Sequence, residues 1–437
     1  MSMPVGLAGS ADKTLQRALD AYRDEQGAVA ALVSRKLELA SQYDVEGMES
    51  AVNICFWGRS GSLLLASYLD SHDHLVMLPR NCSEFIYPFL AGFKALSVWE
   101  KLLAYPIYSE LQFGLEGSFF RGDFPIAAAD YYAAVHALFA LYGDRPTPWL
   151  NTRARFFQLL HVAYAAAMGR RPARTRPLIV YAQHWTNDEL ARRFIEDFPD
   201  GRFIHTIRDP ISALDSWFDR ELEMERFGAQ YRPELAPRYL SPAAETIKKL
   251  LRWDRAHEGM EARTRAIRFE DLHLAPSTTM RRLADWLGIP YQPSLLESTF
   301  NGLPYYVRSG GVSWVGANPD NARRRSKNLN SIDRLLVFTL LQENFARWRY
   351  PMPGALRPRW QRLCIMAVLL PLPVKMEAIN ARLVLGQQAL SSLRKGRFGF
   401  ACGALLFLLE RRLRIMLFLA WQTRLRLGGE RQVLQLL

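Results

Sequence analysis

The stretch from Val52 to Asp70, VNICFWGRSGSLLLASYLD, decides the fold class. Its first six residues form a short apolar run that stops at Gly58, as the buried strands of parallel sheets do. Its last eight residues, LLLASYLD, contain good helix formers and no helix breaker. The stretch therefore predicts a strand, a tight turn and a helix in succession.

The same alternation of strand and helix patterns returns further along the chain. Short apolar runs predict strands at Leu178–Ala182, Arg202–Ile207 and Arg265–Phe269. Helical patterns follow these runs at Asn187–Phe198, from Pro210 onward, and at Thr278–Leu287. Strands that alternate with helices indicate parallel α/β units, so we expect a three-layer, P-loop-like parallel sheet flanked by helices.

The chain divides into three predicted segments. Residues 1–50 show apolar residues at helical spacing and predict an N-terminal helical extension. Residues 51–354 contain the α/β pattern, interrupted at 85–177 by a stretch with many aromatic residues and few strand patterns. We expect that stretch to be a helical insertion over the mouth of the sheet, on the side where an acceptor substrate binds. Residues 355–437 form a basic, predicted helical tail.

Composition excludes several classes of protein. Of the 437 residues, 49% are hydrophobic and 23% are charged, which rules out a wholly disordered chain. The four cysteines are scattered and form no CxxC pair, so we expect neither a disulfide framework nor a bound metal. The first residues lack the basic start and apolar run of a signal peptide, which makes the cytoplasm the expected compartment.

The net charge of +13 lies mostly in the tail. Residues 355–437 contain fourteen basic and three acidic residues, whereas the preceding body is nearly neutral. A nucleic-acid-binding protein usually spreads basic residues over its folded reading surface, so we expect no nucleic-acid partner.

The turn after the first strand favours anion binding. It reads Gly58, Arg59, Ser60, Gly61, Ser62, Leu63. Glycines let the backbone approach a ligand, and the unpaired N–H groups at the start of the next helix bind phosphate or sulfate. The turn lacks the lysine of a Walker A loop, GxxxxGK[ST]. The turn therefore suits a phosphate that is bound without a metal. The alternative interpretation is an ordinary strand-to-helix turn that binds no ligand.

A second segment, FIHTIRDPISALDSWF (Phe203–Phe218), brings an arginine to the end of a predicted strand. Ser216 follows Arg208 by eight residues, which is about two helical turns. The two side chains suit a single shared phosphate. A structural ion pair of Arg208 with Asp209 and a solvated Ser216 are the alternative.

Three motifs together resemble the sulfotransferases that use 3′-phosphoadenosine 5′-phosphosulfate (PAPS). They are GRSGSLLLASYLDSHDHLVMLP (58–79), RFIHTIRDPISALDSWF (202–218) and AIRFEDLHLAPSTTMRRLADWLGIPY (266–291). The resemblance is strongest to the carbohydrate and tyrosylprotein branch and its bacterial relatives. It covers roughly Val52 to Pro353, apart from the segment 85–177.

The resemblance implies roles for individual residues. It places the 5′-phosphosulfate at Arg59–Leu63, where family members carry threonines in place of Ser62 and Leu63. It places the 3′-phosphate at Arg208 and Ser216, and at a basic loop before the last helix of the family, where Arg325 or Lys327 stands. A solvated charge run is the alternative for that loop.

Catalysis of sulfuryl transfer needs a base for the acceptor hydroxyl and positive charge at the leaving oxygens. Arg59 is the candidate for the charge. Glu84 is the first candidate for the base, because the resembling branch places a catalytic glutamate there. His184 is the second, because Gln183, His184 and Trp185 stand where family members show lysine, threonine and proline. The alternatives are that Glu84 is an ordinary surface glutamate and that His184 is a packed structural histidine.

The tail pattern favours a membrane surface. The apolar run Leu363–Val374 is too short to span a bilayer, and charged residues interrupt Phe398–Trp421. An interfacial amphipathic helix on anionic lipid fits this pattern, so we expect peripheral attachment to the cytoplasmic face of a membrane. A helical hairpin packed on the body, or a homodimer interface, is the alternative.

The predicted function is transfer of a sulfuryl group from PAPS to a hydroxyl, with a glycan or glycolipid as acceptor. Two rival functions remain open. One is another phosphate-binding enzyme such as a P-loop nucleotide kinase, which would require a lysine in the turn after the first strand. The other is a non-catalytic, membrane-attached nucleotide- or glycan-binding protein on the same fold.

Overall fold

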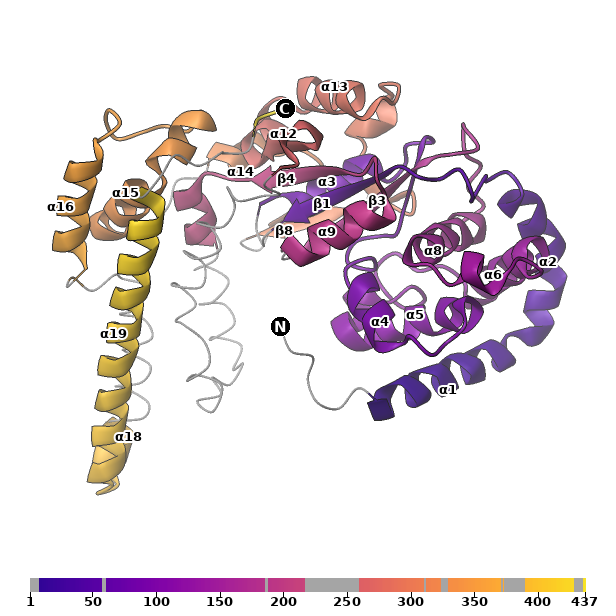
Figure 1. Ribbon diagram of the computed structural model, residues 1–437, viewed down its shortest axis with the longest axis horizontal. Coiled ribbons are helices and arrows are strands. Elements are labelled where there is room, and N and C mark those ends of the chain that lie inside the picture. Colours follow the sequence, from indigo (N-terminus) through magenta and orange to yellow (C-terminus); the bar gives the residue numbers. More distant parts are fainter. Residues whose placement is uncertain are drawn as a thin grey trace.

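The computed structural model describes residues 8–56, 60–184, 188–216, 259–309, 312–323, 329–370, 372, 390–427 and 435–437. Among these residues, five strands form one sheet in the order β2-β3-β1-β4-β5 (Figure 1). The strands are β1 (Ala51–Phe56), β2 (Leu75–Met77), β3 (Leu178–His184), β4 (Arg202–Ile207) and β5 (Thr264–Arg268). All four pairings are parallel, so the predicted α/β fold with a parallel sheet is confirmed.

The sheet separates two layers of helices, because alternate residues of each strand point to opposite faces. On one face, Val52, Ile54 and Ile204 pack against α3 (Ser62–Leu69) and α13 (Pro276–Leu287). On the other face, Cys55, Tyr181 and Phe203 join a larger core. That core includes α8 (Arg153–Ala167) and α9 (Asp188–Asp197), which lie on the opposite side of the sheet from α13 (Figure 1).

The segment between β2 and β3 is helical, as its composition predicts. Its helices are α4 (Ile86–Gly92), α5 (Val98–Phe113), η1 (Gly114–Gly117), α6 (Ala128–Tyr142), α7 (Thr147–Leu150) and α8. The helices α1 (Ala8–Asp24) and α2 (Gln26–Ala40) of the N-terminal extension pack on them. Many aromatic side chains of this segment are buried, including Tyr105, Tyr131, Tyr132, Phe156 and Phe157. They form a core on one face of the sheet and leave little aromatic surface for a substrate.

The chain after β5 continues through short elements to the last helices. These elements are α12 (Phe269–Leu274), α13, η5 (Pro293–Leu296), β6 (Thr299–Phe300), β7 (Leu303–Pro304), β8 (Tyr306–Ser309), β9 (Val312–Val315), α14 (Pro319–Arg323) and α15 (Ser331–Arg347). The short helix η4 (Glu261–Arg263) directly precedes β5. The tail adds α16 (Arg359–Leu369), α18 (Leu390–Arg394) and α19 (Phe398–Leu427). Among the described helices, none combines the length and the apolar character needed to cross a bilayer.

A third core joins the tail to the sheet. Ile207 of β4 and Ala266 of β5 pack with residues of α15, α16 and α19. The last residues of the chain also reach the edge of the sheet, where Ala266 donates its N–H to Gln435 O at 2.7 Å and accepts from Leu437 N at 2.9 Å. The tail is therefore packed on the body at both α16 and its end.

Candidate functional site

The carboxyl ends of β1, β3 and β4 meet at one edge of the sheet. Phe56 pairs with His184, and Cys55 pairs with His205, so the three strands end in register. The strand order places β1 between the other two. The turn after β1, the end of β3 and the Arg208 segment after β4 are thus neighbours, and ligands of open α/β sheets bind at such an edge.

The turn after β1 is described from Ser60 onward, and Arg59 lies outside the described residues. The buried Ser60 hydroxyl lies 2.7 Å from the Thr206 hydroxyl of β4, so the turn is hydrogen-bonded to the neighbouring strand. Gly61 has a φ of 88° and caps the start of α3. A Cβ atom there would lie 2.7 Å from Cδ2 of Phe269, so both the backbone conformation and the close contact require glycine.

Ser62 begins α3 and is buried, and Leu63 packs at the edge of the core beneath that helix. The first N–H groups of a helix have no partner within the helix. Ser60, Gly61, Ser62 and Leu63 therefore form the glycine turn and helix start that the sequence predicts, at the carboxyl edge of the sheet.

Arg208 lies directly after β4 and is 7% exposed. Its guanidinium carbon lies 4.2 Å from the ring centroid of Phe269, the residue that also contacts Gly61. The structure thus brings together the two predicted phosphate-binding segments through one aromatic ring of α12. Such cation–π packing fixes the guanidinium without neutralising its charge.

Asp209 and Glu270 support the turn after Arg208. The Asp209 N–H donates to Glu270 Oε1 at 3.1 Å, and Asp209 Oδ1 accepts the Ser212 N–H at 2.7 Å. Burial raises the pKa of both carboxyl groups, and the nearby Arg208 charge opposes the rise. Residues 210–216 are helical, and Ser216 lies half-buried at the end of the described part of that helix.

Glu84 is a buried residue beside the end of β3. The Ser83 hydroxyl next to it donates to Ala182 O at 3.1 Å and accepts the Ala182 N–H at 3.2 Å. The Tyr105 hydroxyl of α5 donates to Cys82 O at 2.7 Å. Burial, together with the Glu84 carboxylate, raises the pKa of Tyr181 well above its usual range. Glu84 is thus not a surface glutamate, and it lies near the carboxyl edge of the sheet.

The other predicted site residues are only partly described. The backbone of His184 ends β3 beside Phe56, but the position of its side chain lies outside what the structure describes. Arg325 and Lys327 also lie outside the described residues, directly after α14. Within the described part of the chain, no group of three or more His, Cys, Asp or Glu side chains is arranged to hold a metal ion.

Sequence reasoning missed four residues of this site: Thr206, Phe269, Glu270 and His273. His273 is buried against Phe269, with ring centroids 4.4 Å apart. Its Nδ1 accepts the Asn318 N–H at 2.9 Å. Burial, assisted by the Arg208 charge, lowers the pKa of His273 to about 4, so the ring is neutral at pH 7. Three of them belong to the motif FEDLH at 269–273, whose sequence does not show what its side chains contact.

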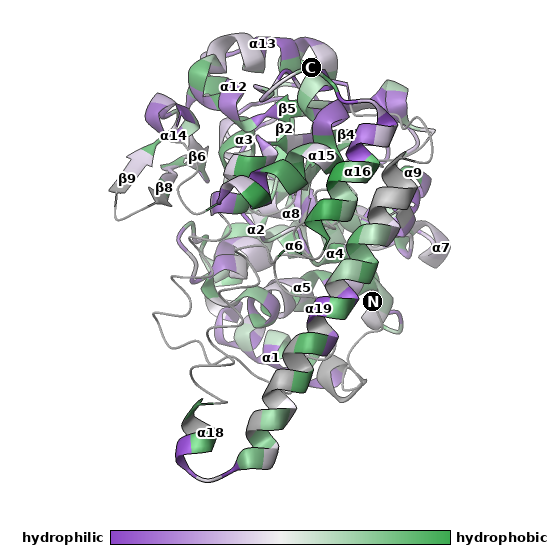
Figure 2. Cartoon of the chain, turned by 90° about the vertical axis from the view of Figure 1, so that its left-hand side faces the viewer, coloured by the Kyte–Doolittle hydropathy of each residue, from purple (hydrophilic) through white to green (hydrophobic). Residues whose placement is uncertain are grey.

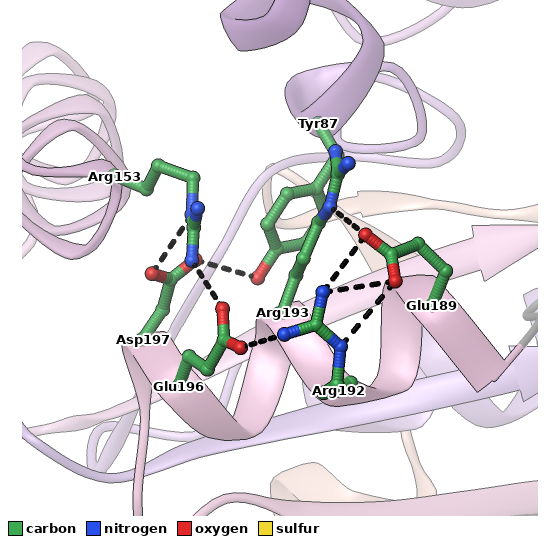
Figure 3. Close-up of polar contacts among 7 residues, drawn as sticks. All are labelled: Tyr87, Arg153, Glu189, Arg192, Arg193, Glu196 and Asp197. Carbon is green, nitrogen blue, oxygen red and sulfur yellow. Dashed lines mark hydrogen bonds and ion pairs between the residues drawn. The ribbon is translucent and has the colours of Figure 1, made fainter.

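A separate charged cluster is centred on α9. Arg153 pairs with Glu196 and Asp197, and the Tyr87 hydroxyl donates to Asp197 Oδ2 at 3.0 Å (Figure 3). Two further arginines of α9 pair with Glu189. The cluster joins α4, α8 and α9, so it serves the packing of this layer.

The sequence of residues 51–293 matches the model of the sulfotransferase family. This match covers more than half of the chain and includes the turn after β1, Glu84, Arg208 and α12. The chain belongs to the sulfotransferase family. The match does not distinguish the carbohydrate and tyrosylprotein branch from others, and no protein of curated function matches the chain significantly.

Several solved sulfotransferases are similar to the chain at low identity. The sulfotransferase domain from the curacin biosynthetic pathway is 18% identical, with 73% of this chain and 97% of that domain covered and a TM-score of 0.34. The sulfotransferase domain of the Synechococcus PCC 7002 olefin synthase is 18% identical, with 74% and 95% covered and a TM-score of 0.30. Sulfotransferase STF9 from Mycobacterium avium is 14% identical, with 78% and 87% covered and a TM-score of 0.33. Family membership therefore rests on the sequence match.

Proposed function

We propose that the chain transfers the sulfuryl group of PAPS to an acceptor hydroxyl, as a member of the carbohydrate and tyrosylprotein branch. One observation carries the proposal. The Phe269 ring contacts Gly61 of the turn after β1 and supports the Arg208 guanidinium. Two segments far apart in the sequence thereby present backbone N–H groups and a fixed positive charge at one edge, which suits a nucleotide with phosphate groups at both its 5′ and its 3′ position.

In this proposal each segment binds one end of the nucleotide. The turn from Arg59 to Leu63 binds the 5′-phosphosulfate through backbone N–H groups and the hydroxyls of Ser60 and Ser62. Arg208, Ser216 and Arg325 bind the 3′-phosphate. No metal is required, because arginine and backbone donors supply the positive potential at the phosphates.

The acceptor hydroxyl attacks the sulfur in line, and the 5′-phosphate leaves. Glu84 is the proposed base that takes the hydroxyl proton, with His184 as the second candidate. Arg59 stabilises the charge that develops on the sulfuryl and leaving oxygens. The buried position of Glu84 beside the end of β3, near the carboxyl edge of the sheet, supports this role.

The proposed acceptor is a hydroxyl of a glycan or glycolipid. We propose that the enzyme acts while it is bound to a membrane surface. Support comes from α19, where seven large hydrophobic side chains are more than half exposed: Phe398, Phe400, Leu406, Leu409, Leu413, Leu417 and Trp421. A helix of this kind beside arginines suits the interface of an anionic membrane. The buried aromatic residues of the 85–177 segment add no support.

The decisive experiment measures binding and transfer by the full chain. Calorimetry with 3′-phosphoadenosine 5′-phosphate and with 5′-AMP, which lacks the 3′-phosphate, should show a large preference for the former. Because a charged hydrogen bond contributes about 1.5–3 kcal/mol, Arg208→Ala should weaken the bisphosphate by about one to two decades and 5′-AMP much less. Equal losses for both ligands would remove Arg208 from this role.

Labelled PAPS then identifies the reaction. Transfer of label to lipid-linked or soluble glycans in an acceptor screen would support the proposal and name the acceptor class. Bisphosphate binding without transfer to any acceptor, and without release of sulfate, would favour the non-catalytic binding protein instead.

A further inference from the structure

We propose that the short helix α12 positions the two described segments that carry proposed phosphate ligands. These segments are the turn at 60–63 and the turn at 208–216. The inference rests on the proposed function. It assigns positioning roles to Glu270 and His273.

Phe269 provides the first contact. Its ring fills the space that a Cβ atom on Gly61 would occupy, and the Arg208 guanidinium lies 4.2 Å from its centroid. One side chain therefore sets the distance between the turn after β1 and the arginine after β4. Both ends of the nucleotide site depend on this ring.

Glu270 provides the second contact. Its two carboxylate oxygens accept from the Asp209 N–H at 3.1 Å and from the Tyr350 hydroxyl at 3.0 Å. The peptide that Glu270 holds is the one directly after Arg208. Tyr350 is itself fixed, because Arg268 donates to the carbonyl oxygens of Trp348 and Arg349 just before it. Tyr350 thus extends the support beyond the residues that the family model matches.

His273 provides the third contact. Its ring packs against Phe269, with centroids 4.4 Å apart, and its Nδ1 accepts the N–H of Asn318, the residue that precedes α14. An acceptor at Nδ1 places the ring hydrogen on Nε2. Because the pKa of His273 is about 4, this bond persists over the whole neutral range. His273 therefore holds α12 against the start of α14 and supports the Phe269 ring on which Arg208 packs.

The test separates positioning from stability by comparing two ligands and paired substitutions in the full chain. Glu270→Leu removes the acceptor of the Asp209 N–H, whereas Glu270→Gln keeps one. His273→Ala removes the acceptor of the Asn318 N–H, whereas His273→Asn keeps an oxygen at the position of Nδ1. Since a single hydrogen bond contributes about 0.5–1.5 kcal/mol, each disruptive change should weaken 3′-phosphoadenosine 5′-phosphate about threefold to tenfold. The affinity for 5′-AMP should change by less than about twofold, and Gln and Asn should restore most of the loss.

His72 supplies a matched control. It is also buried, and its Nδ1 accepts the His74 N–H at 3.1 Å, but it precedes β2 and so lies at the opposite edge of the sheet. His72→Ala should lower the melting temperature without changing the ratio of the two affinities. If Glu270→Leu and His273→Ala behave like His72→Ala, or weaken both ligands equally, the positioning role of α12 is wrong. If Arg208→Ala also leaves that ratio unchanged, the proposed nucleotide site itself is wrong.

Discussion

At the scale of single residues, Glu84 is the proposed group most open to a direct test. Its neighbours hold it in place, because Ser83 is hydrogen-bonded to the Ala182 backbone and Cys82 O accepts from Tyr105. Glu84→Gln keeps the shape and removes the proton acceptor. Turnover with PAPS should therefore fall by about 10² or more, while affinity for 3′-phosphoadenosine 5′-phosphate stays nearly constant.

Glu189→Gln is the control for loss of a carboxylate, because Glu189 pairs only with arginines of its own helix among the described contacts. Its turnover should stay near that of the unchanged chain. If Glu84→Gln keeps full turnover and His184→Ala loses it, the base is His184. Sequence alone could not predict the burial of Glu84, since local patterns do not show that Tyr105 of α5 reaches the carbonyl of Cys82, two residues before Glu84.

At the scale of elements, the joint between α15 and α16 explains how the tail begins. Helix α15 is irregular at Leu341, where φ is −120°. The buried Arg362 of α16 donates Nε to Thr339 O at 3.0 Å and pairs with Glu343. The Gln342 side chain exchanges two further hydrogen bonds with the Arg357 backbone, just before α16. The tail thus supplies hydrogen-bond donors to backbone and side-chain groups of the body.

Arg362→Met should consequently destabilise the whole protein. The change leaves a buried carbonyl oxygen without its donor and Glu343 without its cation, so we expect a loss of about 1–3 kcal/mol in urea unfolding. Arg359→Met removes an exposed arginine from the same helix and should change stability by less than about 0.5 kcal/mol. Equal effects of the two substitutions would show that the joint contributes nothing.

The sequence predicted elements better than their arrangement. The boundaries of β4 match the prediction, and β1, β3 and β5 differ by only a few residues, because short apolar runs between breakers mark buried strands. The order β2-β3-β1-β4-β5 depends on pairings between distant residues, which local patterns do not encode. For the same reason the contact of Phe269 with Gly61 was missed, although both motifs had been recognised.

At the scale of the whole molecule, α19 has two different faces. Leu419 is 3% exposed and packs in the core with Ile207 and α15, and Arg412 donates to Leu370 O at 2.6 Å. Leu406, Leu409, Leu413, Leu417 and Trp421 recur every three or four residues and remain exposed, which makes a stripe along the helix. Figure 2 shows α19 projecting from the body toward α18 with hydrophobic residues along its length.

Because the inner face of α19 belongs to the folded core, deletion of residues 357–437 would expose that core and test stability more than attachment. Substitution on the stripe avoids this problem. Leu406→Gln, Leu409→Gln and Leu413→Gln together should leave nucleotide binding unchanged, since none of these residues contacts the site. The same change should reduce co-sedimentation with phosphatidylglycerol vesicles by about tenfold or more, because burying each leucine contributes about 1.5–3 kcal/mol.

Salt and lipid composition then distinguish the membrane from a second copy of the chain as the occupant of the stripe. Arginine attraction to anionic lipid is screened and apolar insertion is not, so high salt should weaken binding of the unchanged chain without abolishing it. Neutral phosphatidylcholine vesicles should bind less. The opposite outcome has two parts. The unchanged chain would bind neither kind of vesicle and would sediment as a dimer in the ultracentrifuge, and the triple glutamine variant would sediment as a monomer. The stripe would then join two copies of the chain, and the membrane proposal would be wrong.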